Sequence, residues 1–195
     1  MYKKLFLYLM IAFLSYFPYI CFAKANGLMP SKLARISVEN YLKNKKTNSN
    51  NFNLNNSIHI KPVGVFVTIL DKNNHSKGCW GRLYPQNNLE ESIITAAIDA
   101  ATKDYRVRPL QKSDLSEVKF QVSFVTKIYP VSSIRSINPY RDGLMVQSGS
   151  KSGIILPGEA TDAYYQMVMA KLKAGINPKE KCTLFQLITK VYKEV

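Results

Sequence analysis

Apolar residues recur along the chain with two periods, one typical of helices and one typical of strands. Spacing of three to four residues predicts three helices, over 30–45, from Asn88 to about Tyr105, and over 161–174. Runs that alternate, or that are dense in β-branched and aromatic residues, predict six strands, at 63–70, 77–83, 118–126, 143–147, 153–156 and 184–195. This order, with strands joined as hairpins, predicts an α+β fold with a mostly antiparallel sheet flanked by helices.

Local signals support several of these boundaries. Asn88 can cap a helix, and Glu91 stands three residues on, where a capping-box acid belongs. The turn-forming residues from Asp71 to Ser76 join two strands into a hairpin, which places Cys79 on a strand. Strict alternation from Val118 to Thr126 predicts a strand with one covered face and with Lys119, Gln121 and Ser123 on the other face.

The N-terminus has the pattern of a secretory signal peptide. A short basic start precedes the almost wholly apolar run Leu5–Phe22, and Ala23-Lys24-Ala25 fits a small-x-small cleavage site. We therefore expect a signal peptide over 1–25 and an exported protein. An uncleaved membrane anchor at residues 5–22, or a lipoprotein modified at Cys21, is the alternative, and the membrane would then be met only through this segment.

Residues 26–195 are predicted to form a single domain, interrupted by a flexible Asn-rich connection at 44–56. The net charge is +14 at pH 7, and leaving out the three lysines of the predicted signal peptide leaves 24 basic and 13 acidic residues, or +11. This excess favours an anionic small molecule or an envelope polymer as partner, although scattered lysines also serve solubility. Tyrosines and arginines interleave at 105–108 as in single-strand binders, but predicted export argues against nucleic acid.

The segment from Lys77 to Gly81 is the first candidate for chemistry. It sets Cys79 between Gly78 and Gly81, so backbone and ligand can approach closely. Cys79 is a candidate nucleophile, and Lys77, on the same face of an alternating strand, would lower its pKa; Arg82 falls on the other face. Two alternatives stay open: a buried packing role, and a disulfide between Cys79 and Cys182 in an oxidising compartment.

Other reactive groups are sparse. His59 and His75 both fall in predicted loops, so neither is an evident base for Cys79. The spacing of cysteines and histidines matches no zinc pattern, and we predict no metal and no cofactor.

Asp104 and Arg106 follow the second predicted helix. Arginine suits bidentate contact with carboxylate or phosphate, so these residues, with Lys77 and Arg108, could form an anion site; a structural ion pair is the alternative.

Several segments, in order, resemble the AMME chromosomal region gene 1 family. They are Val63-Gly-Val-Phe-Val-Thr68, Lys77-Gly-Cys-Trp-Gly-Arg-Leu-Tyr-Pro85, Asp104-Tyr-Arg106, Leu115–Phe124, Asp142-Gly-Leu-Met-Val146, Gly153-Ile-Ile-Leu-Pro157 and Lys173-Ala-Gly-Ile176. The resemblance implies a larger sheet-bearing part and a smaller part, with a cleft between them.

The family resemblance also bears on partners and chemistry. Family members commonly accompany a Memo-like protein and a radical-SAM protein, but an exported domain could not meet cytoplasmic partners. The chain departs from the family pattern at Lys77, Trp80 and Tyr105, where the family has Arg, Ile and Pro. The family's reaction is not settled, so whether this chain is an enzyme stays open.

Three hypotheses follow from the sequence. In the first, the cleft binds a small or extended anionic ligand beside Cys79, with ligand contacts from Gly78, Gly81, Arg82, Asp104, Arg106 and Arg108. The alternatives are a non-catalytic envelope interaction module, and a thiol-dependent enzyme that uses Cys79 with Lys77.

Overall fold

The computed structural model describes residues 28–44, 52–54, 58 and 60–194. The predicted signal peptide or anchor, Cys21 and His59 lie outside the described residues, as does most of the predicted connection at 44–56. Within the described part, no helix is long and apolar enough to cross a membrane.

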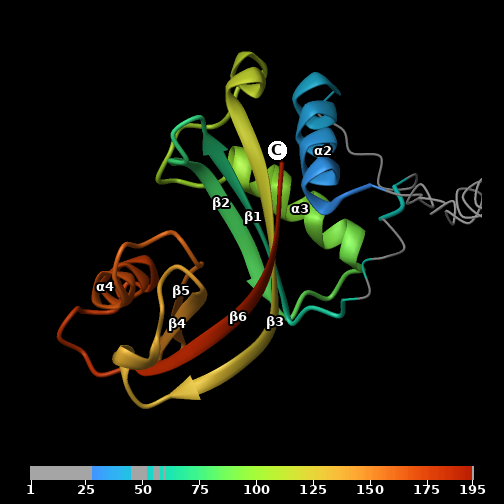
Figure 1. The fold of residues 1–195 in the computed structure, drawn as a ribbon. Helices are drawn as coiled ribbons and strands as arrows, with labels where there is room; N and C mark the ends of the chain where they lie inside the picture. The colour runs from blue at the N-terminus through green and yellow to red at the C-terminus, as the bar shows by residue number, and fades with distance from the viewer. Residues whose placement is uncertain (1–27, 45–51, 55–57, 59, 195) are drawn as a thin grey trace, which may run out of the picture.

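The described residues form three α-helices and six strands (Figure 1). The helices are α2 (Pro30–Asn44), α3 (Leu89–Thr102) and α4 (Ala163–Ala174). The strands are β1 (Gly64–Asp71), β2 (Ser76–Leu83), β3 (Val118–Val131), β4 (Asp142–Ser148), β5 (Lys151–Ile155) and β6 (Thr183–Lys193), with short 3-10 helices at Lys112–Glu117 and Ile134–Ser136. The predicted α+β class and element order are confirmed.

The six strands of the described residues form one antiparallel sheet in the order β2-β1-β3-β6-β4-β5. The chain makes the same motif twice, a hairpin followed by a helix and a further strand: β1-β2-α3-β3 and then β4-β5-α4-β6. The last strands of the two motifs, β3 and β6, pair along the middle of the sheet and join its two halves (Figure 1). The hairpins therefore lie at opposite ends of the sheet, with β2 and β5 as its edges.

Helices cover the two halves separately. Helices α2 and α3 pack on one face of β1, β2 and β3, over a core that includes Val67, Phe120 and Phe124. Helix α4 packs on β4 and β5 over a second core that includes Leu144 and Val146. The opposite face of the curled sheet holds a third, small cluster: Phe66, Cys79, Val125, Leu156 and Leu187.

Two glycines allow the helices to lie close to the edge strands. A Cβ atom at Gly78 of β2 would lie 2.1 Å from the carbonyl oxygen of Ala100 in α3, and one at Gly153 of β5 would lie 2.0 Å from that of Ala170 in α4. A Cβ atom cannot lie so close to a carbonyl oxygen. Glycine at these two positions therefore lets β2 pack closely against α3, and β5 against α4.

The prediction that one face of β3 is exposed is wrong for most of that face. Lys119 is exposed as predicted, but Gln121 and Ser123 are only 7% and 1% exposed. Their face of the strand is the one that holds the third cluster: in the register of β1 and β3, Gln121 pairs with Thr68 and Ser123 with Phe66. Both faces of β3 are thus covered from Phe120 to Val125, which alternation alone did not show.

Candidate functional site

A cleft of about 370 Å³ lies between the edge strands of the two halves. Five consecutive residues of β2, Cys79–Leu83, line one side, together with Asp104, Tyr105 and Arg106, which follow α3. Ser152–Ile154 of β5 and Lys173 of α4 line the other. The cleft thus brings together five of the predicted site residues: Cys79, Gly81, Arg82, Asp104 and Arg106.

Asp104 is the most constrained side chain of the cleft. It is 6% exposed and accepts four hydrogen bonds, one from the backbone N–H of Cys79 at 2.8 Å and three from Arg106: its backbone N–H at 3.1 Å, Nε at 2.9 Å and Nη2 at 2.7 Å. Burial by itself would raise the pKa of Asp104, but the Arg106 guanidinium and the two amides hold it at about 2. The carboxylate is therefore charged at neutral pH and ties the segment after α3 to the edge of β2.

Arg106 keeps donors available to a ligand. Its guanidinium carries five N–H groups, and Asp104 takes one from Nε and one from Nη2, which leaves three. The Arg106 side chain is 37% exposed, and the hydrogen bond with Asp104 raises its pKa, so it stays a cation. Across the cleft, Lys173 donates from Nζ to the carbonyl of Ile154 at 3.0 Å and has two further N–H groups. The cleft therefore presents two fixed cations from opposite halves.

Cys79 is a buried thiol. It is 5% exposed, lies among Phe66, Val125 and Leu187, and accepts a 3.4 Å hydrogen bond at Sγ from Thr68 Oγ1. Burial and the charge of Glu159 raise its pKa to about 12, against smaller lowering effects from Lys173, the Thr68 hydroxyl and Arg106. The thiol is therefore protonated at neutral pH. The cations that lower its pKa are Lys173 and Arg106, and not Lys77, which the sequence predicted.

The other predicted residues lie apart from this cleft. Gly78 is buried against α3. Arg108 forms an exposed bidentate pair with Asp114, with two 2.8 Å hydrogen bonds, and the charge of Lys77 also acts on Asp114. The pairing of Cys79 with Cys182 is not formed: both are free, and Cys182 packs against the core under α4, a different cluster from that of Cys79.

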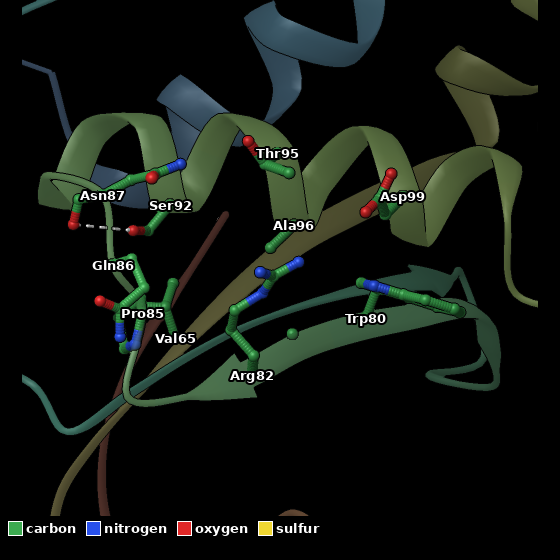
Figure 2. A pocket seen from close by; sticks show the side chains of 11 residues that line it. Val65, Trp80, Arg82, Pro85, Gln86, Asn87, Ser92, Thr95, Ala96 and Asp99 are labelled. Atoms are coloured by element: carbon green, nitrogen blue, oxygen red, sulfur yellow. Dashed lines mark hydrogen bonds between the residues drawn. The ribbon is translucent and has the colours of Figure 1, made fainter.

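Arg82 points away from Cys79. A small pocket of about 50 Å³ lies between β2 and α3, and Figure 2 shows the Arg82 side chain rising from β2 toward Ala96 of α3 inside it. The strand register gives the reason, because Arg82 pairs with Val65 and shares its helix-covered face, whereas Cys79 pairs with Thr68 on the other. Arg82 borders the cleft, but its guanidinium faces this separate pocket.

Sequence reasoning missed the second wall of the cleft. The sequence predicts a helix at Lys173 and a strand at Gly153 and Ile154, both within family segments, and it leaves Ser152 in the turn before that strand. The signal that could have found them is the repeated hairpin-helix-strand order, because pairing its two halves through their last strands places the hairpins at opposite edges of one sheet.

Comparison with known proteins agrees with this architecture. The AMMECR1 family profile matches residues 31–193, nearly all of the described chain. The chain belongs to the AMMECR1 family. Its similarity to other proteins covers both halves of the fold, so the cleft lies within the AMMECR1 domain itself.

Relatives and a solved structure extend this comparison. A protein of Thermofilum pendens is 36% identical over 170 residues, which are 77% of this chain and 79% of that protein. One from Methanocella arvoryzae is 29% identical over 184 residues, 87% of this chain and 91% of that protein. The crystal structure of an uncharacterized protein from Pyrococcus horikoshii is similar with a TM-score of 0.74 and 27% identity, over 85% of this chain and 89% of that one. The family resemblance expected from the sequence is thus confirmed.

Proposed function

We propose that the cleft between β2 and β5 binds a small or extended anionic ligand. The observation that carries the proposal is the pair of cations that face the cleft, Arg106 and Lys173, with N–H groups that no described residue takes up. Asp104 is already saturated by four hydrogen bonds, so it holds Arg106 in place and competes little for a ligand.

The lining beyond these charges suits a ligand with an apolar part. Phe66, Leu83 and Ile154 line the cleft, and Tyr105 at its rim is 81% exposed. An anionic group at Arg106 and Lys173 would leave the rest of the ligand over this apolar floor. The protonated, buried thiol of Cys79 supports a lining role, and gives less support to the alternative of a thiol-dependent enzyme.

The test is the binding of succinate and of pyrophosphate by the full chain, measured by titration calorimetry. We expect Lys173→Gln to weaken binding about tenfold, since a hydrogen bond to a charged group contributes about 1.5–3 kcal/mol. Arg106→Lys, which keeps the charge but loses the guanidinium fork, should also weaken it. Lys179→Gln is the matched control, because Lys179 is exposed and does not line the cleft. Unchanged binding in Lys173→Gln, or an equal loss in Lys179→Gln, would overturn the proposal.

We also propose that this protein acts outside the cytoplasm, on the strength of the signal-peptide pattern in residues 1–25. The intact mass of the protein isolated from its host tests this. Cleavage after Ala25 is the expected result, and a full-length mass in the soluble cytoplasmic fraction would contradict it.

A further inference from the structure

At the cleft wall on β2, one residue has outward main-chain groups that no described residue bonds. The Cys79 N–H bonds to the Asp104 carboxylate, so it points away from β1. Backbone groups alternate in direction along a strand, and the pairing with β1 is regular from Leu83 to Gly78. The N–H and C=O of Gly81 therefore also point away from β1, at the open edge of the sheet.

The wall on β5 repeats this arrangement. The Ile154 carbonyl accepts a hydrogen bond from Lys173 Nζ, and its pairing with β4 is regular from Leu144 to Ser148. By the same alternation, the N–H and C=O of Ser152 also point away from β4. On each edge strand, one outward backbone group is bonded to a charged side chain: Cys79 N–H to Asp104 on β2, and the Ile154 carbonyl to Lys173 on β5. Two positions away, the outward N–H and C=O of Gly81 and of Ser152 are free for an outside partner. Within the described part of the chain, Gly81 and Ser152 have no other main-chain partner on this side.

We propose that the ligand of this cleft is an extended acidic peptide segment, which adds to the edge of β2 and reaches Ser152 of β5. This inference rests on the proposed anion-binding function and names its ligand class. A peptide offers both an N–H and a C=O at strand spacing, and strand addition to a free edge is a general mode of peptide recognition. A simple carboxylate such as succinate has no donor for the carbonyls of Gly81 and Ser152.

The charges and dimensions of the cleft fit such a segment. Cys79–Leu83 spans about 13 Å of strand edge, since a strand rises about 3.3 Å per residue. An acidic side chain of the peptide would meet Arg106 or Lys173, and a neighbouring residue would lie over Phe66 and Ile154. The glycine at position 81 serves packing within the sheet, because a Cβ atom there would lie 2.3 Å from the Val65 carbonyl oxygen and 2.5 Å from the Phe66 ring; its outward backbone is what the peptide would pair with.

The test compares two probes on the full chain. One is a mixture of N-acetylated, C-amidated pentapeptides with Asp at the centre and varied flanking residues, and the other is succinate. Binding is measured by titration calorimetry, and the NMR shift of the Gly81 amide, which wild type and the Ser152 variants all keep, reports contact at the β2 edge. We expect the peptides to bind at least tenfold more tightly than succinate, and N-methylation of the central Asp to remove most of that gain.

Ser152→Pro is the decisive variant. It removes an N–H that points away from β4, a change that edge strands tolerate, and Ser152→Ala is its control. We expect Ser152→Pro to weaken peptide binding at least fivefold more than it weakens succinate binding. Peptides that bind no better than succinate, or that ignore both N-methylation and Ser152→Pro, would overturn the inference and leave the anion site standing. If Lys173→Gln changes neither probe, the proposed function itself fails.

Discussion

Replacing Asp104 with Asn tests the link between the fold and the cleft. The substitution keeps the shape of the side chain but removes its charge and replaces one acceptor oxygen with a donor NH₂ group. Four donors now converge on the carboxylate, two backbone N–H groups and two from the Arg106 guanidinium. Each oxygen accepts two of these hydrogen bonds, so whichever oxygen becomes NH₂, two donors lose their partner and face another donor.

The structure sets the size of the effect. The pKa of Asp104 falls from its ordinary value of 3.8 to about 2, which corresponds to about 2 kcal/mol of stability at neutral pH. The unpaired donors add to this, so we expect a loss of about 3 kcal/mol at pH 7. Because the folded-state pKa is lowered, the charge-dependent part is fully present above about pH 5 and is lost as pH falls toward 2. About half of it should be gone at pH 3.

Urea unfolding of wild type and Asp104→Asn at pH 7 and pH 3 measures this difference. Asp114→Asn is the control, because Asp114 also pairs with an arginine and has a pKa of about 2, but its partner Arg108 is 58% exposed. We expect the control to cost less than about 1 kcal/mol, as exposed ion pairs do. Equal losses in the two variants at pH 7, or a loss in Asp104→Asn that does not shrink at pH 3, would refute the reasoning.

Two further predictions concern the thiols and the glycines. Because the pKa of Cys79 is about 12 and its thiol is buried, iodoacetamide at pH 8 should alkylate Cys79 far more slowly than the half-buried Cys182, as followed by mass spectrometry. In urea the two cysteines should react at the same rate. Equal rates in the native protein would contradict the burial of Cys79. Gly153→Ala should cost at least about 3 kcal/mol in urea unfolding, because the new Cβ meets the Ala170 carbonyl of α4. Gly149→Ala, in open space at φ 56°, should cost only about 1 kcal/mol; a similar cost for both would show that α4 can move away from β5.

Features set by neighbouring residues could be predicted from the sequence. Asn88 caps α3 as expected, with its side-chain oxygen accepting from the N–H of Glu91 at 2.8 Å. Gly175 ends α4 in the left-handed conformation, and the turn from Asp71 to Ser76 forms the predicted hairpin. The alternation argument also placed Cys79 and Arg82 on opposite faces of β2, which the register confirms.

Features set by distant residues could not be predicted. Lys173 stands more than ninety positions after Cys79, and only the curl of the whole sheet sets them on one cleft. Arg108 was expected at the anion site, but Asp114, six residues on, takes its guanidinium. A list of basic residues near a motif does not show which of them already have a carboxylate partner, and that decides which can bind a ligand.

The two halves of the domain use opposite charges for the same structural task. In the first, a carboxylate that follows α3 accepts the outward N–H of β2; in the second, an ammonium on α4 donates to the outward C=O of β5. Charged groups on an exposed edge discourage uncontrolled pairing with other strands. In this domain, the outward N–H and C=O of the residue two positions away, Gly81 on β2 and Ser152 on β5, stay available to a ligand. Because Asp104 both closes the β2 edge and fixes Arg106, variants of Asp104 should lose stability and ligand affinity together, whereas Ser152→Pro should separate the two.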